Sequence, residues 1–453
     1  MTRANRREVV AGGIAAGITS GIAATFAGCA PRPRFDAEVI VIGAGLAGLY
    51  AARLLAAEGR DVLVLEADSR VGGRTLSFDV DGHTLEGGGE QIGSSYARVR
   101  DVADEEGLEI VADRAPLPTH IHLGGEIIPP DAWRDHPLNP MPDGYRDASP
   151  GSALFRAAAP HNLLADPGAW ADLADMSAKA FLTREGFSAE AQRLIDHTLN
   201  GTALDSYGMA NLFRSLALYR LDREGGPSGH MVGGMQRLSI KMAARLDVRL
   251  STPVLAIHED AHGVSVLTEM KGFRAPHVIS SLPLPVYRRV EMRTAFDISP
   301  LVDAIPYTAI HQVHFRATPR DHNIWSDEPM ERVFAHRDSE GTPSGLFRAW
   351  INGRGAVNRI LSADARLAPD KALPKVMGED VDMVRDIDWG PLNPLAGGAY
   401  RHFQPGQSRA FGRAFEAQSG RVRFAGEHTS SFHTGLEGAM ESGEREAFRL
   451  LGV

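Results

Sequence analysis

The sequence predicts an α/β protein that contains a Rossmann-like domain. A strand, a glycine turn, a helix and a second strand follow one another over residues 38–66, and another strand and turn lead into a helix over residues 420–445. The chain has 453 residues, which is more than one compact domain usually holds. We therefore expect two closely joined domains.

The N-terminal pattern has the order of a dinucleotide-binding βαβ unit. Residues 38–42 form a short apolar run rich in β-branched side chains, as in a strand buried on both faces. Residues 49–58 have helical periodicity, and residues 62–65 form a second strand that ends at Glu66. This complete context predicts dinucleotide binding, whereas a glycine motif alone could be a simple packing turn.

Each glycine of the turn has a separate steric role in such a unit. Gly43 permits the sharp turn, Gly45 lets the backbone approach a pyrophosphate, and Gly48 lets the helix pack closely on the strand. The helix N-terminus then faces the phosphates. Glu66 is placed to accept hydrogen bonds from the hydroxyls of the adenosine ribose.

The βαβ unit alone fits both FAD and NAD. A second glycine turn follows at residues 70–75, and it contains Arg74. This turn and its arginine can contact the same pyrophosphate from the other side. Two such contacts suit a cofactor that stays bound, which favours FAD.

Charge and cysteine content exclude some classes of function. The formal net charge of −9 argues against a nucleic-acid partner, because the phosphates would be repelled. The same charge weakly favours small cationic ligands such as amines. The only cysteine is Cys29, so neither an intrachain disulfide nor a cysteine-based metal site is expected, and no metal residue is assigned.

Residues 1–29 have the layout of a bacterial export signal. Arg6 and Arg7 precede an uncharged stretch over residues 9–28, and this pair indicates the twin-arginine route for folded proteins. Small residues before Cys29 resemble a lipoprotein processing site. We expect a lipid on Cys29 and a position on the periplasmic side of a membrane. The alternatives are an ordinary signal peptide with an incidental cysteine, or an uncleaved anchor.

Together with three further segments, the dinucleotide motif is similar to the flavin amine oxidase family. These segments are EGGGEQIG at residues 86–93, GRVRFAGEHT at residues 420–429 and TGLEGA at residues 434–439. The family includes monoamine oxidases, polyamine oxidases and L-amino acid oxidases. The resemblance spans nearly the whole mature chain and is strongest at its two ends.

This resemblance implies an FAD cofactor. Val254 would lie against the adenine through its backbone, and Glu427 would contact the ribityl or pyrophosphate region. Relatives with cysteine-linked FAD form that bond at the position of Ala399, so we expect non-covalent FAD. The implied cofactor-binding residues are Gly43, Gly45, Leu46, Ala47, Gly48, Glu66, Ala67, Arg74, Gly88, Gly89, Glu90, Gln91, Val254, Glu427, Gly435, Leu436 and Ala439.

The helix that begins at residues 434–439 has a physical reason to face the flavin. Hydride transfer leaves negative charge around flavin N1 and the C2 carbonyl. Unpaired backbone N–H groups at a helix N-terminus stabilise such charge. We therefore expect a functional helix start here and not an ordinary capped surface helix.

Substrate contacts follow from the same resemblance. Family members that oxidise amines often have an aromatic residue on each side of the substrate nitrogen. One position is Tyr400 and the other is Gly435, so only half of this pair is present, and Phe432 or His433 would have to fill the gap. L-amino acid oxidases bind the substrate carboxylate through an arginine where this chain has Gln91, so a free amino acid is a poor candidate substrate.

A histidine occupies the position of a family lysine. Many relatives hold a water against flavin N5 with a lysine, in a strand that matches residues 307–315, and His311 falls at that position. A histidine can hold a water or move a proton, although one in a half-buried strand is often structural. Loss of the lysine favours a membrane electron carrier or quinone over oxygen as the electron acceptor.

The resemblance also implies a discontinuous FAD-binding domain with an inserted α+β substrate domain. Helical patterns cover residues 189–199 and 211–221, and strand patterns cover residues 306–315, 332–335 and 347–350. The expected segments are 37–113, 231–290 and 388–453 for the FAD-binding domain, and 114–230 and 291–387 for the substrate-binding domain.

These inferences predict an enzyme that oxidises an amine at its α-carbon by hydride transfer to flavin N5, with hydrolysis of the imine afterwards. One alternative is an FAD-dependent desaturase or isomerase of an apolar molecule. Another is a flavin-binding lipoprotein without turnover. The sequence does not determine the oligomeric state.

Overall fold

The structure is a computed structural model that describes residues 34–161, 171–362, 364, 367–430 and 432–453. Residues 35–453 form one compact unit. The predicted export signal, with Arg6, Arg7 and Cys29, lies outside the described residues. The predicted division into two domains stays a prediction. No helix in the described ranges is both long and apolar enough to cross a bilayer.

A five-stranded parallel sheet contains the predicted βαβ unit. Its central strands and the helix between them agree with the sequence prediction to within a few residues. The sheet joins segments from both ends and the middle of the chain, as a discontinuous domain requires. In order across the sheet, the strands are β22 (Val422–Phe424), β13 (His277–Ser280), β1 (Val39–Ile42), β2 (Val62–Leu65) and β9 (Asp247–Arg249).

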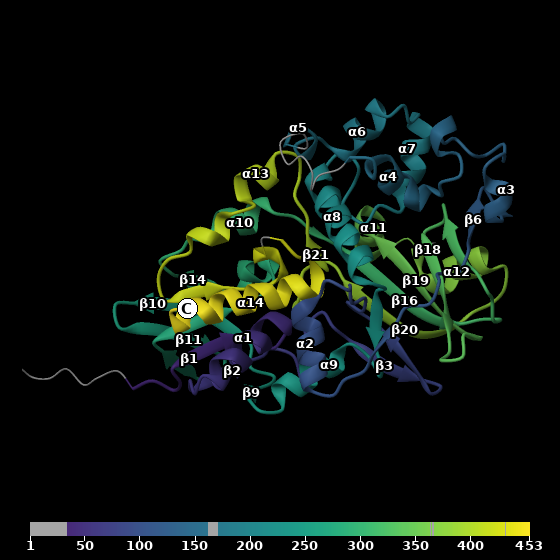
Figure 1. Ribbon diagram of the computed structural model, residues 1–453. Helices are drawn as coiled ribbons and strands as arrows, with labels where there is room; N and C mark the ends of the chain where they lie inside the picture. Colours follow the sequence, from purple (N-terminus) through teal and green to yellow (C-terminus); the bar gives the residue numbers. More distant parts are fainter. Residues whose placement is uncertain (1–33, 162–170, 363, 365–366, 431) are drawn as a thin grey trace, which may run out of the picture. The chain divides into compact units, whose positions relative to one another are not determined.

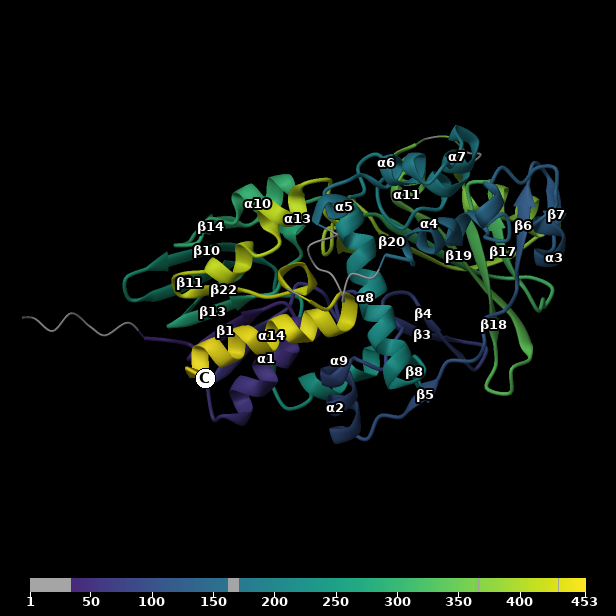
Figure 2. The same cartoon turned by 45° about the horizontal axis from the view of Figure 1, so that its top comes forward.

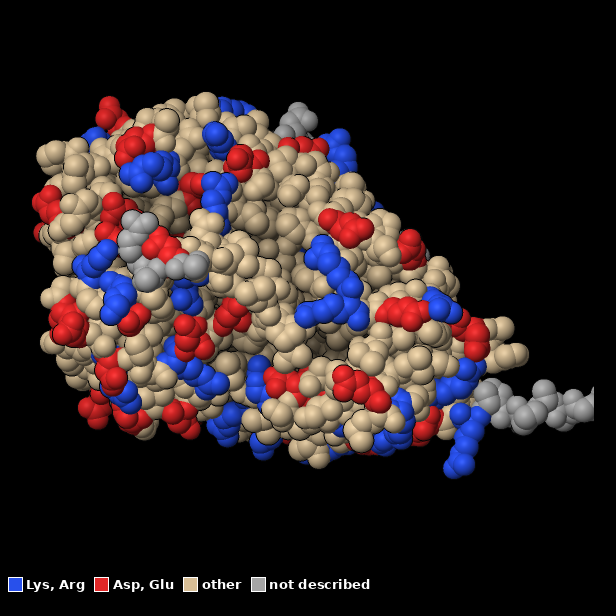
Figure 3. Space-filling model, turned by 180° about the vertical axis from the view of Figure 1, so that it is seen from behind, with Lys and Arg blue, Asp and Glu red and all other residues tan. Residues whose placement is uncertain are grey.

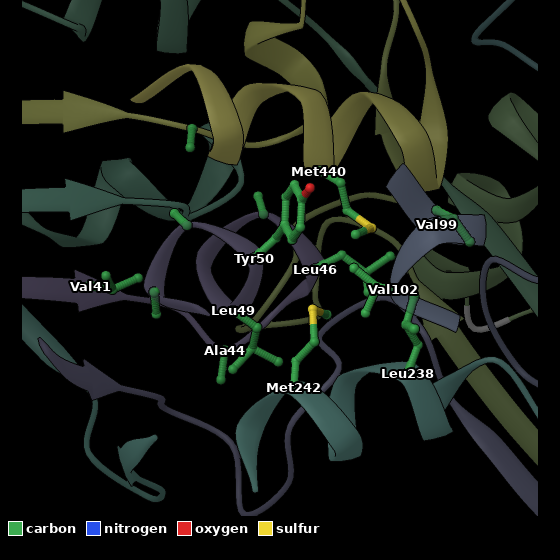
Figure 4. Close-up of a cluster of buried hydrophobic side chains, with 14 of the residues drawn as sticks. Val41, Ala44, Leu46, Leu49, Tyr50, Val99, Val102, Leu238, Met242 and Met440 are labelled. Atoms are coloured by element: carbon green, nitrogen blue, oxygen red, sulfur yellow. The ribbon is translucent and has the colours of Figure 1, made fainter. Parts of the chain in front are cut away.

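The first and last long helices pack against each other on this sheet. Figures 1 and 2 show α1 (Leu46–Ala57) beside α14 (Gly435–Leu451). A Cβ on Gly443 would overlap the carbonyl oxygen of Ala47, so only glycine permits this close approach. Met440 of α14 lies beside Tyr50 of α1 in the same buried cluster (Figure 4).

Two more helices close the other side of that cluster. Val102 comes from α2 (Ala97–Glu105) and Met242 from α9 (Gln236–Ala243), and both are buried against α1 (Figure 4). Glu437 of α14 accepts hydrogen bonds from the backbone N–H groups at the start of α2, so its carboxylate caps that helix. The segment around α14 is thus fixed by both apolar contacts and buried hydrogen bonds.

A seven-stranded sheet forms the second large layer, and it contains the predicted strands over residues 332–335 and 347–350. Of the predicted strand over residues 306–315, it contains the part from Ile310 onward. Helices α11 (Gly353–Leu361) and α12 (Pro369–Met377) cover one of its faces with apolar side chains. In order, its strands are β20 (Asp382–Trp389), β16 (Ile310–Arg316), β19 (Pro343–Asn352), β18 (Arg332–Arg337), β17 (Asn323–Ser326), β6 (Thr119–Leu123) and β7 (Glu126–Ile128).

A helical layer packs on the end of this sheet, around the buried Phe213 and Trp325. The helices predicted over residues 189–199 and 211–221 are both present. The layer contains α4 (Pro150–Ala158), α6 (Ala178–Arg184), α7 (Ala189–His197) and α8 (Met209–Gly225) (Figure 1).

Smaller elements complete the described fold. A four-stranded sheet contains β12 (Gly272–Ala275), β11 (Gly263–Thr268), β10 (Val254–Asp260) and β14 (Glu291–Arg293). Three two-stranded sheets pair β15 (Tyr307–Thr308) with β21 (Tyr400–Arg401), β3 (Ser77–Val80) with β4 (His83–Glu86), and β5 (Ile110–Ala112) with β8 (Gly229–Met231). The short helices are α3 (Pro130–Trp133), α5 (Ala171–Ala174), α10 (Ser299–Ala304) and α13 (Gln407–Phe411).

The surface carries charges of both signs. On the face seen in Figure 3, acidic and basic side chains are interspersed, and neither sign forms one extended patch.

A buried carboxyl group makes stability depend on pH. Burial raises the pKa of Glu331 from 4.5 to about 8, although Asn352 donates two hydrogen bonds to it. The stabilisation from the protonated carboxyl is therefore complete below about pH 4.5 and is lost as pH rises through about 8.

We predict that Glu331→Gln gains stability relative to the wild type as pH rises from about 5 to about 8. The gain is at most a few kcal/mol, because one pKa unit corresponds to about 1.4 kcal/mol. Urea unfolding at both pH values measures it, with Glu340→Gln at an exposed position as control. An identical difference between variant and wild type at the two pH values would contradict the prediction.

Candidate active site

One large cavity connects the chain ends with the seven-stranded sheet. Its volume is about 2110 Å³, compared with roughly 300–1,000 Å³ for ordinary small-molecule sites. It therefore has room for a long cofactor together with a substrate. The predicted residues that line it are Gly43, Gly45, Leu46, Ala47, Glu66, Ala67, Arg74, Gly88, Gly89, Glu90, Gln91, Val254, Tyr400, Glu427, Gly435, Leu436 and Ala439.

The glycines of the first turn differ in what surrounds them. A Cβ on Gly45 would meet no atom within 4 Å, so the backbone there borders open cavity. Gly43 has a φ of +99°, which favours glycine. Gly48 does not line the cavity, because it packs against strand β1, where an added Cβ would overlap the carbonyl oxygen of Gly43. Its part in the site is thus the close packing that the sequence predicts, without direct contact.

Glu66 lies at the end of β2, between the glycine turn and the cavity. Its carboxylate accepts hydrogen bonds from the backbone N–H groups of Ala44, at 2.6 Å, and Asp68, at 2.8 Å. Burial raises the pKa of Glu66, and these two hydrogen bonds oppose that shift. The carboxylate is held in place and keeps lone pairs for the hydroxyls of a ribose.

Arg74 joins the two distant motifs across the cavity. Its Nη1 donates to the carbonyl oxygen of Ala399 at 2.6 Å and to Oε1 of Glu427 at 3.2 Å. Glu427 also accepts a hydrogen bond from the backbone N–H of Arg401 at 3.3 Å. The second glycine turn and the C-terminal motif are therefore parts of one site.

Helix α14 begins at the cavity wall, as predicted. Thr434 precedes it without a side-chain capping hydrogen bond, so the first N–H groups remain available. Gly435 has a φ of +56°, and a Cβ there would meet no atom within 4 Å. The positive end of a long helix thus faces open cavity at the position expected for a flavin ring.

The seven-stranded sheet presents a polar and aromatic face to the cavity. Strand β16 contributes Gln312 and His314, and the facing residues of β19 are Trp350 and Arg348. Phe334 of β18 continues this face. None of these residues was predicted to belong to the site, although strand alternation in residues 310–316 indicates which side chains share a face.

His311 faces the other side of the same strand, so the predicted catalytic role does not match the structure. Its ring is fully buried and contacts Asp386 of β20 and Arg359 of α11. It is not among the described residues that line the cavity. Because side chains alternate along a strand, its neighbour Gln312 takes the cavity position.

Phe432 also lies away from the expected substrate position. Its side chain is 41% exposed and contacts the ring of His433, and neither residue is among the described lining residues. The backbone carbonyl of Phe432 accepts a hydrogen bond from Arg214, which fixes the loop before α14. The aromatic residues that line the cavity besides Tyr400 include Trp350 and Phe334 of the sheet.

The polar residues that line the cavity differ in protonation state and ion pairing. Burial, followed by Arg348 and Arg385, lowers the pKa of His314 to about 3, so its imidazole is neutral at pH 7. Arg348 donates to both carboxylate oxygens of Glu90, at 2.9 and 2.6 Å. Burial raises the pKa of the Tyr400 phenol, which therefore stays protonated.

The cavity thus fits a dinucleotide between two helix N-termini, with a substrate space against the sheet. The sequence pattern that defines flavin containing amine oxidoreductases matches residues 46–451. The chain belongs to this family. It is accordingly a flavin-dependent enzyme of the amine oxidase and dehydrogenase class, and the flavin of the family is the group that the cavity fits.

Two relatives extend over nearly all of the chain. Pseudooxynicotine dehydrogenase from a Pseudomonas species is 26% identical over 459 residues, covering 92% of this chain and 86% of the relative. The flavin-containing amine oxidase B of Bos taurus is 25% identical over 458 residues, covering 91% and 86%.

Solved structures share the fold. Cyclohexylamine oxidase from Brevibacterium oxydans matches with a TM-score of 0.72 and 22% identity, covering 92% of this chain and 99% of that chain. A putrescine oxidase bound to putrescine matches with a TM-score of 0.70 and 21% identity, with the same coverage. The α/β fold of the flavin amine oxidases, predicted from the sequence, is thereby confirmed.

We predict that Gly45→Ala loses FAD while the apoprotein remains as stable as the wild type. The added methyl group enters open cavity, at a φ of −79° that alanine adopts easily, but it occupies space needed by the pyrophosphate. FAD affinity should fall at least about tenfold, or about 1.4 kcal/mol. Flavin fluorescence and thermal unfolding of the apoprotein measure the two effects.

Gly48→Ala is the matched comparison. Its methyl group would overlap the backbone of Gly43, so both folding and FAD binding should suffer. Full FAD retention by Gly45→Ala would contradict the assigned pyrophosphate position.

Proposed function

We propose that the protein oxidises an amine at the carbon next to its nitrogen. Bound FAD would supply the hydride acceptor at N5. The amine loses a hydride and a proton to become an imine, and water then hydrolyses the imine. The observation that supports this best is the uncapped start of α14, which faces the same cavity as the polar and aromatic sheet face.

The residues of this chain have distinct tasks in that reaction. The N–H groups at Gly435 stabilise the negative charge that accompanies hydride transfer. Tyr400 and Trp350 hold the substrate carbon skeleton against the reacting face. His314 is neutral and can accept a hydrogen bond from the substrate or from a water.

We also propose that the FAD is held without a covalent bond, since Ala399 lines the cavity where some relatives carry a cysteine. The turn around Gly45 and the Arg74–Glu427 pair would then retain the cofactor by shape and hydrogen bonding alone.

We predict that at least one primary, secondary or polyamine bleaches the flavin absorbance of the purified protein without oxygen. Tyr400→Leu should lower kcat/KM for that amine about tenfold or more, or about 1.4 kcal/mol, while Tyr400→Phe keeps the ring and most of the rate. Anaerobic stopped-flow absorbance measures both.

Absence of bleaching by every amine would refute the amine reaction. Bleaching by an unsaturated or alicyclic hydrocarbon instead would support the desaturase or isomerase alternative.

The electron acceptor is proposed to be something other than oxygen. No lysine is among the described residues that line the cavity, and Gln312 occupies the cavity face of strand β16. The relative named pseudooxynicotine dehydrogenase is consistent with this proposal.

We predict that Gln312→Lys speeds reoxidation of the reduced flavin by oxygen about tenfold or more, because a cation then holds water near the flavin and stabilises reduced oxygen. Gln312→Leu removes the amide without adding charge, so it should not speed this reoxidation. Mixing the photoreduced protein with oxygenated buffer gives both rates. Rapid reoxidation of the wild type would overturn the proposal.

A further inference from the structure

A row of three polar side chains crosses the cavity face of the seven-stranded sheet. Gln312 of β16 is opposite Trp350 of β19, and Trp350 is opposite Arg332 of β18. Residues opposite each other in antiparallel strands point to the same face, so all three side chains share one face of the sheet. Gln312 and Trp350 line the cavity, and Arg332 lies behind them beside Trp350, outside the described lining residues. The Arg332 guanidinium lies 5.4 Å from the ring centroid of Trp350.

Several polar atoms of this row have no hydrogen-bond partner among the described residues. Arg332 Nε and Nη2, Trp350 Nε1 and Gln312 Oε1 are all buried without a hydrogen bond, and so is the hydroxyl of Tyr400 nearby. An unpaired buried donor costs about 1–3 kcal/mol, and a charged one costs more. Several such groups side by side therefore indicate a polar ligand between them.

No ion pair of Arg332 occurs among the described residues. Burial raises the pKa of the adjacent Glu331, which favours its neutral form. Glu90 is already bound to Arg348 through both oxygens. Burial lowers the pKa of Arg332, but a guanidinium remains protonated near neutral pH.

We propose that the Arg332–Trp350–Gln312 row binds a carboxylate of the substrate, so that the enzyme acts on amines that also carry an acid group. This inference rests on the proposed amine oxidation. A planar guanidinium binds a carboxylate through two N–H groups, and the indole N–H can donate to the same oxygens. A simple alkylammonium ion would instead be repelled by the unpaired cation.

The position of the row also indicates which acids fit. Gln91 lines the cavity in the segment that borders α14 through Gly89, and it carries no charge, so it offers no cation to a carboxylate there. The acid group is therefore placed at the sheet, away from the reacting nitrogen, as in an ω-amino acid or an aminomethyl-substituted aromatic acid.

Binding of a non-reactive acid tests this inference without turnover. The FAD-loaded protein is titrated with benzoate and butanoate and with their neutral counterparts, benzyl alcohol and butanol, while the flavin absorbance is followed. We expect at least one acid to bind more tightly than its alcohol. Arg332→Gln should weaken the binding of that acid about tenfold or more and leave the binding of the alcohol unchanged. Arg316→Gln, in an exposed ion pair outside the described lining, is the matched control.

Arg332→Lys provides a second variant that keeps the charge but loses the planar pair of donors, so it should give intermediate binding. FAD content per chain should be unchanged in both variants, which separates this role from cofactor binding. Equal binding of every acid by wild type and Arg332→Gln, or loss of FAD from that variant, would overturn the proposal.

Turnover gives an independent comparison. Benzylamine is compared with 4-(aminomethyl)benzoate, and butylamine with 4-aminobutanoate. The wild type should have the higher kcat/KM for an acid of one pair, and Arg332→Gln should reverse that preference. If no amine reduces the flavin, amine oxidation fails as the function, while Arg332-dependent acid binding still decides whether the anion site exists.

Discussion

The close crossing of helices α1 and α14 determines the rest of the site. Gly443 lets α14 approach the backbone of Ala47, and this contact brings two helix N-termini from opposite ends of the chain to one cavity. The first is positioned for phosphates and the second for the charge on a reduced flavin ring. Arg74 and Glu427 reinforce the same junction with a hydrogen bond across the cavity. Without that crossing, the two helix N-termini would not border the same cavity.

The seven-stranded sheet supplies the opposite wall and has a different physical character. Its outer face is packed with apolar side chains against α11 and α12, whereas its cavity face carries polar groups buried without partners. An apolar substrate would leave Arg332 and Trp350 unsatisfied, at considerable cost in free energy. This polarity favours a substrate with its own polar groups over the hydrocarbon substrates of a desaturase.

The sequence predicts the cofactor half of the site better than the substrate half. Glycine spacing, a strand and a terminal acid are local signals with steric causes, so Gly43, Gly45 and Glu66 all lie where expected. The start of α14 was predictable for the same reason.

Substrate residues lack such local signals. A shift of one position along β16 exchanges the two faces of the strand, which is why His311 is buried against Arg359 while Gln312 faces the cavity. Phe432 or His433 was expected to fill the space beside Gly435, but neither is among the described lining residues, which include Trp350 of β19. Their roles depend on strand pairing between distant segments.

The most direct test of FAD binding in this cavity is the FAD content of the purified protein after denaturation. We predict that one FAD is released per chain, and a colourless protein that takes up no added FAD would contradict the assignment of the cavity to FAD.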